Sequence, residues 1–504
     1  MSKTITLSPV TRIEGHLGIK VEVEDGKVAR AQVSGEMFRG FENLLRGRDP
    51  LDAQYITQRI CGVCPLDHGI ASVLAQDMAY QLTPPDNGRI VRNLMQAANF
   101  IASHITHFYL LSALDFVDVA MITEYQGKDH ALLDLQAWVK SQLASRQVYP
   151  AAPFLPRFNT KYLADKDANF GALKHYLDAL DIRAQAQKMA ALFAGKVPHA
   201  ASLVPGGVTV KVTSLNLSQY GTLLEQVRDF VDQAYLPDVL AVAGAFPEYF
   251  SLGRGCGNFL SYGAFPESRE AGSKFLAGGA QIKGQWQPVD PDAVTEEVGQ
   301  SRFSSGTGLK PFDGETVAAP EKKGAYSWLK APRYRGEPME VGPLARTLAA
   351  YQDGHNVELK TAVDNLLKTL GRPATDLLSV MGRHAARAVE CKLVADRCVV
   401  WLDQLKPDAP SFKDFSIPDA GRGCGLTEAA RGALGHWLEI KDRKISNYQC
   451  VVPTTWNCSP RDDRGVPGPV EQALIGVAVA DAENPMEVAR VVRSFDPCLA
   501  CAVH

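Results

Sequence analysis

The sequence predicts a mainly α-helical fold of the α+β class, with a core of long bundled helices and small β-structure at the periphery. Apolar residues recur at helical spacing over five long segments, at about 88–115, 171–195, 217–245, 342–370 and 375–404. A strand-like alternation of apolar and polar residues is clearest in a short N-terminal stretch, residues 17–33. Helices are therefore expected to dominate the middle of the chain.

The β-structure is expected in two places. Residues 1–35 should form a β-hairpin region, because apolar residues alternate from Leu17 to Val23 and Asp25-Gly26 is typical of a type I′ turn. The stretch from about 262 to 335 is richer in glycine, proline and charge, which favours loops and short strands. No repeat or flexible linker divides the chain, so residues 1–504 are expected to form a single domain.

Composition excludes some classes of function. The formal net charge of −3 shows no basic excess, which argues against a nucleic-acid-binding protein. No apolar run is long enough to span a bilayer or to act as a signal peptide, so we expect a soluble chain without its own signal. The compartment stays open, because a partner's signal can carry a subunit across a membrane.

Four of the ten cysteines form two C-x-x-C pairs, Cys61-Gly-Val-Cys64 and Cys498-Leu-Ala-Cys501. Zinc modules place such pairs some 15–20 residues apart, whereas 433 residues lie between Cys64 and Cys498. The helix-rich surroundings also argue against a thioredoxin-like redox pair. A four-thiolate site that joins both chain ends is favoured, although structural zinc remains possible. The six other cysteines are expected to be small buried apolar residues, namely Cys256, Cys391, Cys398, Cys424, Cys450 and Cys458.

Local sequence places these pairs and adds two histidines. Gly62 interrupts one helical pattern and Pro65 suits the start of another, so the first pair should lie at a helix end. His68 follows Cys64 by four residues and can hydrogen-bond a thiolate from the same helical face, or be a satisfied core histidine. His504, three residues after Cys501, brings an imidazole and the terminal carboxylate close to any bound metal.

At this point the residues resemble a known family. Arg59-Ile-Cys61-Gly-Val-Cys64-Pro-Leu-Asp-His68 and Asp496-Pro-Cys498-Leu-Ala-Cys501-Ala-Val-His504 resemble the two signature motifs of nickel–iron hydrogenase large subunits. Further segments that resemble family blocks cover nearly the whole chain: 11–16, 38–40, 47–50, 330–333, 340–346, 431–437 and 452–457. The resemblance implies the large-subunit fold of these enzymes.

The resemblance also implies a metal centre and a reaction. In the family, nickel takes four thiolates and shares two of them with an iron that carries cyanide and carbon monoxide. By motif, Cys61 and Cys498 correspond to the terminal nickel ligands, and Cys64 and Cys501 to the bridging ones. The implied activity is reversible heterolytic cleavage of H2 into protons and electrons, with H2 uptake as the expected direction.

Further residues match family positions around the metals. Glu14 corresponds to the glutamate that takes a proton from the thiolate matching Cys498, and Thr454 to a hydroxyl that hydrogen-bonds a cyanide. Arg431 corresponds to the arginine over the open metal position, with Asp496 as its carboxylate partner. Taken alone, Glu14 would be interpreted as a surface carboxylate or a helix-cap partner, although the apolar strand after it favours burial, and Arg431 and Asp496 as an ordinary ion pair.

A second metal site and a processing step follow from the same resemblance. Glu42, the backbone carbonyl of Cys450 and His504 fall where the family binds a further divalent ion, usually magnesium, which prefers oxygen ligands. The family's large subunit is made with a C-terminal extension that a dedicated protease removes, leaving histidine last. A chain that ends at His504 is therefore expected to be the mature form.

The implied partner is an iron–sulfur small subunit, in a heterodimer or a dimer of heterodimers, because this chain offers no second cysteine cluster for electron transfer. A cytochrome or a quinone-linked protein would accept the electrons. We expect a periplasmic or membrane-associated complex held through the small subunit, with a cytoplasmic location still open. An H2-sensing regulatory hydrogenase is the main alternative; a silent quinone-pocket subunit is disfavoured, because that relative lacks the metal thiolates.

Two positions depart from the family pattern. Ser103 stands where many members carry an aspartate near the open site, and Ala430 replaces a proline that often precedes the arginine. The first change removes one expected anchor for Arg431. Ser103 is also reminiscent of the selenium-containing branch, but position 498 is a cysteine here.

Overall fold

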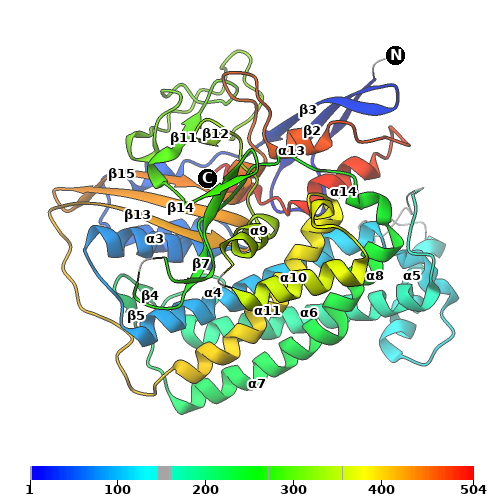
Figure 1. Ribbon diagram of the computed structural model, residues 1–504, viewed down its shortest axis with the longest axis horizontal. Coiled ribbons are helices and arrows are strands. Elements are labelled where there is room, and N and C mark those ends of the chain that lie inside the picture. Colours follow the sequence, from blue (N-terminus) through cyan, green and yellow to red (C-terminus); the bar gives the residue numbers. More distant parts are fainter. Residues whose placement is uncertain (1–2, 146–157, 159, 271, 355) are drawn as a thin grey trace.

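Long helices lie side by side and form the largest layer of the molecule (Figure 1). The computed structural model describes residues 3–145, 158, 160–270, 272–354 and 356–504. The four longest helices of the described residues are α4 (Asp86–Thr106), α6 (Lys166–Ala194), α7 (Ser214–Phe230) and α11 (Val380–Gln404), and the shorter α8 (Leu236–Ala245) continues the line of α7. A π-helical turn, His107–Ser112, extends α4, and another, Val231–Tyr235, joins α7 to α8. The predicted long-helix core is confirmed, including the segments at 88–115 and 217–245.

One predicted long helix is in fact two shorter helices, so this prediction is wrong. The segment at 342–370 is divided into α9 (Pro343–Asp353) and α10 (Val357–Leu370). Gly354, with a φ of 73°, ends α9 in the left-handed conformation that glycine adopts without steric cost. The Asn356 side chain then accepts a hydrogen bond from the Leu359 backbone amide and begins α10. Apolar periodicity continued through this break and concealed it.

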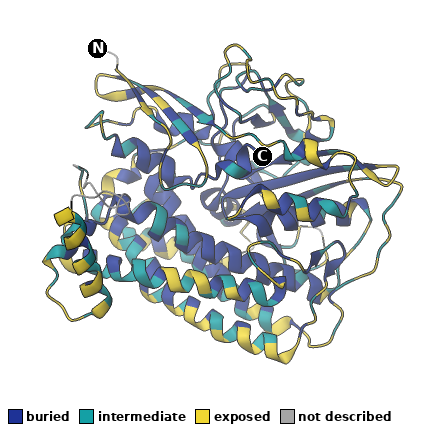
Figure 2. Cartoon of the chain, turned by 180° about the vertical axis from the view of Figure 1, so that it is seen from behind, coloured by how far each residue is buried: buried dark blue, intermediate teal, exposed yellow. Residues whose placement is uncertain are grey.

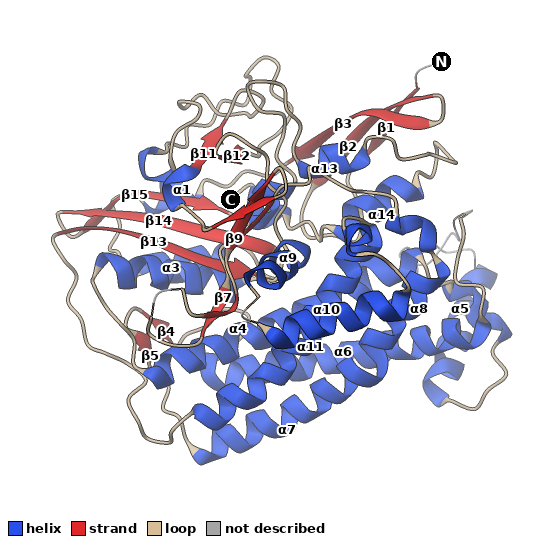
Figure 3. Cartoon of the chain, in the orientation of Figure 1, coloured by secondary structure: helices blue, strands red, loops and turns tan. Residues whose placement is uncertain are grey.

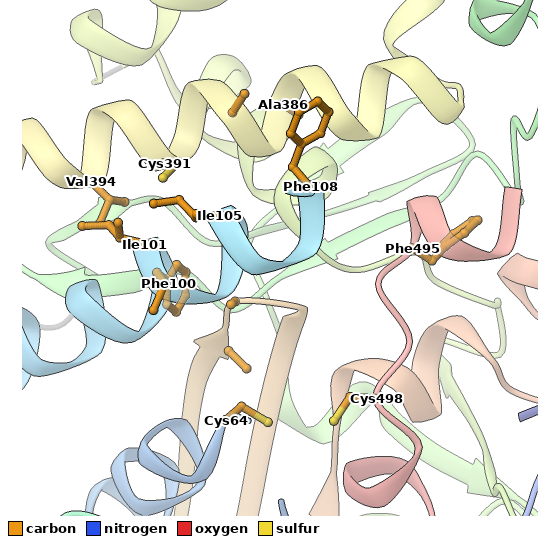
Figure 4. Packing of buried hydrophobic residues seen from close by; sticks show 14 of the residues in the cluster. Cys64, Phe100, Ile101, Ile105, Phe108, Ala386, Cys391, Val394, Phe495 and Cys498 are labelled. Atoms are coloured by element: carbon orange, nitrogen blue, oxygen red, sulfur yellow. The ribbon is translucent and has the colours of Figure 1, made fainter. Parts of the chain in front are cut away.

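The centre of the bundle is the contact between α4 and α11. Figure 4 shows Ile101 and Ile105 of α4 facing Val394 and Cys391 of α11, and Phe108 of the π-helical turn next to Ala386. Burying each of the large side chains contributes on the order of 1.5–3 kcal/mol. The outer faces of the long helices are exposed, as the yellow surfaces in Figure 2 show.

Most of the scattered cysteines are buried as predicted. Cys391, Cys398, Cys450 and Cys458 are buried, whereas Cys256 and Cys424 are only partly buried, so the prediction is wrong for these two.

A second layer combines an antiparallel sheet with one helix. The sheet consists of β13 (Ala420–Ala429), β14 (Gly432–Lys441) and β15 (Lys444–Val451), and α3 (Pro65–Ala79) lies against it (Figure 3). Three alternate glycines of β13 face the helix, namely Gly421, Gly423 and Gly425, and a Cβ atom at each would collide with backbone oxygens of Ala79, Ala75 and Ala71. Glycine therefore lets α3 approach the sheet to backbone contact, which fixes the position of its N-terminus.

The N-terminal sheet agrees with the sequence prediction. It consists of β1 (Lys3–Leu7), β2 (Leu17–Glu24) and β3 (Lys27–Gly35), paired antiparallel in chain order. Asp25 and Gly26 both have positive φ, 49° and 76°, as a type I′ turn requires. The Val33 amide of β3 donates to a Glu471 carboxylate oxygen at 3.0 Å, which ties the sheet to α13 (Pro469–Leu474).

The remaining elements are short. The 262–335 stretch is a series of loops and small strands, as predicted. Its strands are β7 (Ala264–Pro266), β8 (Lys274–Leu276), β9 (Gly279–Ile282), β10 (Gln285–Gln287), β11 (Val294–Glu297) and β12 (Ala331–Tyr334), and β6 (Phe259–Ser261) comes just before it. Elsewhere lie α1 (Phe41–Leu45), α2 (Asp52–Thr57), α5 (His130–Ser145), α12 (Pro453–Asn457), α14 (Met486–Ser494), α15 (Leu499–Ala502), β4 (Leu203–Val204) and β5 (Gly207–Val208). Among the helices of the described residues, none has the length and apolar character needed to cross a membrane. The assignment of one domain stays a prediction.

The contact between β13 and α3 predicts the effect of a single methyl group. Gly425→Ala would place Cβ against the Ala71 carbonyl, and overpacking of this kind costs about 1–3 kcal/mol or more. We expect a lower Tm and lower yield of the purified complex. The control is Gly244→Ala in α8, which is exposed with no atom within 4 Å of the new Cβ and should be neutral or slightly stabilising. Equal Tm values for both variants would contradict the packing argument.

Candidate metal centre

The two ends of the chain meet through a short β-bridge. The Glu14 amide donates to the Pro497 carbonyl at 3.3 Å, and the Leu499 amide donates to the Glu14 carbonyl at 2.8 Å. Gly15 follows with a φ of 82°, and a Cβ there would lie 2.8 Å from the Leu499 Cβ. Glycine at this position allows the N-terminal segment to lie directly on the segment that carries Cys498.

This bridge and α3 bring the two cysteine pairs together. The Sγ atoms of Cys61 and Cys498 are 3.3 Å apart, those of Cys64 and Cys501 are 3.0 Å apart, and those of Cys498 and Cys501 are 3.1 Å apart. All four residues are buried, and their sulfurs all lie within 4.8 Å of one another. Cys64 is the N-cap of α3 and Cys498 is the N-cap of α15, so each pair begins a helix. Figure 4 shows Cys64 and Cys498 facing each other beneath the helix bundle.

Four buried thiols at this distance need a cation to ionise together. Burial raises the pKa of Cys498 and of Cys501, whereas hydrogen bonds from Cys498 and its neighbours lower the pKa of Cys61. A bound metal ion stabilises thiolates directly, and soft sulfur ligands suit late transition metals. The donor set therefore fits a thiolate-bound metal centre.

His68 links this cluster to the sheet. Its Nε2 lies 3.4 Å from Cys501 Sγ, and its Nδ1 lies 3.1 Å from Nε2 of His436 on β14. The His436 Nδ1 is in turn 2.8 Å from the Tyr448 hydroxyl on β15. Burial lowers the pKa of His68 to about 3, so the imidazole is neutral. A neutral imidazole can donate one hydrogen bond to the sulfur without adding charge.

Glu14 contacts the cluster from the other side. Its Oε2 lies 3.2 Å from Cys498 Sγ and accepts a hydrogen bond from the Ala500 amide at 2.8 Å. Burial is the main cause that raises the pKa of Glu14. A carboxyl group with a raised pKa beside a thiol can exchange a proton with it at moderate pH.

Arg431 is held next to the sulfurs by three contacts. Its Nη2 lies 3.0 Å from the Asp496 Oδ1, its Nε donates to the Asp496 carbonyl at 3.0 Å, and its Nη1 lies 3.4 Å from the Ser103 hydroxyl. Thr454 lies close by, where its Oγ1 accepts a hydrogen bond from the Cys498 amide at 2.9 Å. Accepting this bond leaves the Thr454 hydroxyl proton available for another acceptor.

A second cluster surrounds Glu42. Its Oε1 accepts a hydrogen bond from the Cys450 amide at 2.8 Å and lies 3.2 Å from His504 Nε2. Its Oε2 accepts from the Thr316 hydroxyl and lies 3.3 Å from Lys330 Nζ. Against the opposing effect of burial, Lys330 and His504 hold the pKa of Glu42 well below its usual range. A cavity of about 10 Å³ lies among these side chains, enough for one ion or water.

Comparison with known proteins identifies the chain's relatives. A family profile described as nickel-dependent hydrogenase matches residues 39–504, and a profile described as HoxL-like matches residues 4–34. The chain belongs to the nickel-dependent hydrogenase family. The sequence-based predictions of a hydrogenase large subunit, of its fold and of an enzyme that acts on H2 are confirmed.

Individual relatives agree over the whole length. The periplasmic NiFeSe hydrogenase large subunit of Desulfomicrobium baculatum is 44% identical, covering 99% of this chain and 94% of the relative. The uptake hydrogenase large subunit of Rhizobium leguminosarum bv. viciae is 38% identical, covering 100% and 95%. The reduced Ni-Fe-Se hydrogenase of D. vulgaris Hildenborough superimposes with a TM-score of 0.88 at 42% identity, over 100% of both chains. The selenium in the names of two of these relatives does not carry over to this chain, because position 498 is a cysteine in this sequence.

The hydrogenase fold places every predicted site residue in one of the two clusters, but several neighbours were not foreseen. His436 and Lys330 fall within segments that resemble the family, yet nothing in the sequence indicated their contacts with His68 and Glu42. Thr316 and Tyr448 carried no signal at all. Their contacts bridge segments that are far apart in the sequence, and periodicity or motif spacing does not report such contacts.

Asp67 is the other residue that sequence reasoning missed. It is fully buried on α3, where its Oδ2 accepts a hydrogen bond from Asn99 Nδ2 at 2.9 Å. Burial raises the pKa of Asp67 to about 8, although Gln96, Arg431 and the Ala430 backbone act in the opposite direction. The proline that often stands at position 430 in the family would have no backbone amide to contribute there.

Asp67 predicts a pH dependence of stability. The unfolded chain releases this proton near pH 4, whereas the folded protein keeps it up to about pH 8. The folded state therefore binds more protons between these values, and stability falls as pH rises, by up to about 1.4 kcal/mol per pH unit. Asp67→Asn cannot ionise, so its Tm relative to wild type should rise steadily from pH 5 to pH 8. A constant difference across this range would refute the assignment.

Proposed function

We propose that this hydrogenase large subunit holds a nickel–iron centre, with cyanide and carbon monoxide on the iron, at Cys61, Cys64, Cys498 and Cys501. The supporting observation is the buried cluster of four sulfurs within 4.8 Å of one another. By family motif, all four cysteines would hold the metals through their thiolates, with Cys61 and Cys498 expected as the ligands of nickel alone and Cys64 and Cys501 as the shared ones. When bound, the metals supply a redox-active, Lewis-acidic site at which H2 is polarised.

The protein's own residues then move the proton. Cys498 Sγ would accept the proton released from H2, since it is the expected terminal thiolate and contacts the Glu14 carboxyl group. Glu14 takes the proton from this sulfur across 3.2 Å, and the Ala500 amide holds its Oε2 in place. Burial keeps the pKa of Glu14 above its ordinary value, which suits a group that must both accept and release a proton.

The other side chains hold the centre in position. Arg431, fixed by Asp496 and Ser103, places a positive charge next to the thiolates, where it would help to orient the substrate. His68 is the hydrogen-bond donor to Cys501. Thr454 orients the Cys498 backbone, and its free hydroxyl proton would be available to a cyanide on the iron.

The Glu42 cluster is proposed as the site of a magnesium ion, with His504 and the Cys450 carbonyl as further ligands. The Cys450 amide points at Glu42, and a strand residue's N–H and C=O face the same edge, so the carbonyl is directed there too. Glu42 and Glu296 place two carboxylates against the single positive charge of Lys330. A bound cation would balance the remaining negative charge.

The same function implies partners. Two metal-ligating groups are found among the described residues, the four cysteines and the Glu42 cluster, so the electrons must leave through an iron–sulfur small subunit in a heterodimer. We further propose that the enzyme works in the direction of H2 uptake and that its electrons pass to a cytochrome or quinone-linked carrier. The proposal also includes maturation by a C-terminal protease and a periplasmic location. The names of the uptake and periplasmic relatives support the direction and the location.

Metal analysis tests the proposal. We expect about one nickel per chain, with infrared bands from cyanide and carbon monoxide, and H2 turnover with an artificial acceptor. Cys498→Ser should lose nearly all turnover, because a serine hydroxyl is a poor soft-metal ligand and proton acceptor. The matched control is Cys424→Ser on β13, outside both clusters, which should keep nickel and activity. Zinc as the only metal would overturn the proposal.

The proton route has its own test. Glu14→Gln keeps the shape of the side chain but cannot carry a proton, so the metals and their infrared bands should be retained. The rate at which the enzyme exchanges isotopes between H2 and D2O should fall by about 100-fold or more, the range seen for loss of an acid–base group. Glu24→Gln, exposed on β2, is the control and should exchange normally. Normal exchange in Glu14→Gln would refute the relay.

A further inference from the structure

A separate cavity lies between α3, α4 and β7, near the end of α3 that is far from the cysteines. Its volume is about 290 Å³. Its apolar wall includes Ile70 and Leu74 of α3, Phe265 of β7 and Leu426 of β13. Ile70, the wall residue of α3 nearest to Cys64, lies six residues beyond it, which is about 9 Å along a helix. None of the cysteines of the metal centre lines the cavity, so the two sites are separate.

Positive charge collects at this cavity. Its wall carries Arg89, Arg92, Arg269 and Lys274, whereas two carboxylates, Asp77 and Asp86, are paired with them. Asp77 is bound to Arg92 at 2.6 Å, and Asp86 is bound to Arg269 at 3.0 Å. Four cations against two carboxylates leave a formal excess of two positive charges.

Lys274 is the cation with the least compensation. Its Nζ donates to the carbonyls of Tyr262 at 2.8 Å and Gly263 at 3.2 Å, and no described carboxylate lies within ion-pair distance. An ammonium group has three donors, so one remains. The negative charge of Glu428 raises the pKa of Lys274 without a direct contact, because the Glu428 oxygens are hydrogen-bonded to Arg346 and the Tyr262 amide. Burial lowers the pKa of Lys274 to about 8, as expected of an ammonium without a counterion.

Arg89 adds a second incomplete group. Its Nη1 donates to the Pro266 carbonyl at 2.6 Å, whereas its buried Nε has no hydrogen-bond partner in the described part of the chain. Asp86 is 3.6 Å from this Nε and is already engaged by Arg269. Because Arg89 lacks a complete set of acceptors, its charge adds to the uncompensated positive charge of the cavity wall, which an anion would balance.

We propose that this cavity binds a small organic monocarboxylate with an apolar chain. The carboxylate would be received by Lys274 and Arg89, and the chain would pack on Leu74, Phe265 and Leu426. An apolar wall with a few convergent polar groups is the usual construction of a small-molecule site. Bare inorganic anions would leave the apolar wall unused. This site is independent of the proposed hydrogenase chemistry.

Calorimetric titration of the purified holoenzyme complex tests the site, with octanoate as the probe. We expect saturable binding with one octanoate per large subunit, at least about tenfold tighter than octan-1-ol or inorganic phosphate. Lys274→Met should weaken octanoate binding at least about tenfold while nickel content and H2 turnover are unchanged. The control is Lys283→Met, an exposed lysine in the turn between β9 and β10, which should bind octanoate as wild type does.

Three results would overturn the proposal: no saturable octanoate binding, equal binding by wild type and Lys274→Met, or equal affinity for octanoate and phosphate. If Lys274→Met does not assemble, Arg89→Met provides the same comparison at the other donor. Because turnover and nickel content are measured on every variant, failure of this site is distinguishable from failure of the metal-centre proposal.

Discussion

Two main-chain hydrogen bonds between Glu14 and the segment around Cys498 hold the beginning of the chain to its end. The metal centre depends on them, because one cysteine pair begins α3 and the other begins α15, hundreds of residues later. Closing so long a loop costs conformational entropy, which only extensive packing can offset. The helix bundle and the backbone contact of α3 with β13 supply that packing. The four sulfurs are thus held by the whole fold.

The chemistry of the site follows from burial as much as from residue type. The same low-dielectric surroundings raise the pKa of Glu14, keep His68 neutral and oppose ionisation of Cys498. Without a metal the cluster would be a set of costly buried thiols. With one, the thiolates gain a counter-charge, and the raised pKa of the neighbouring carboxyl group suits the proton transfer that we propose for Glu14. Stability and function therefore depend on the same ligand.

Sequence periodicity predicted the long helices well, since each presents a wide apolar face to the core. It did not predict the sheet of β13, β14 and β15. In β13, glycines at alternate positions take the place of the apolar residues that mark a strand, because α3 leaves no room for side chains. In β14, burial on both faces removes the alternation. At the site, motif spacing located the cysteines, but Lys330, Tyr448 and Asp67 act through contacts between distant segments that spacing cannot report.

The two positions expected to depart from the family pattern, Ser103 and Ala430, both lie around Arg431. Ser103 keeps a contact with the guanidinium at 3.4 Å but contributes no charge. Asp67 brings a carboxyl group to the same neighbourhood from α3, on which the Arg431 charge acts directly. The Ala430 backbone, whose N–H a proline would lack, lowers the pKa of this carboxyl against the larger effect of burial. Ser103, Ala430 and Asp67 thus lie around one guanidinium, whose charge partner is Asp496, while burial keeps the Asp67 carboxyl protonated up to about pH 8.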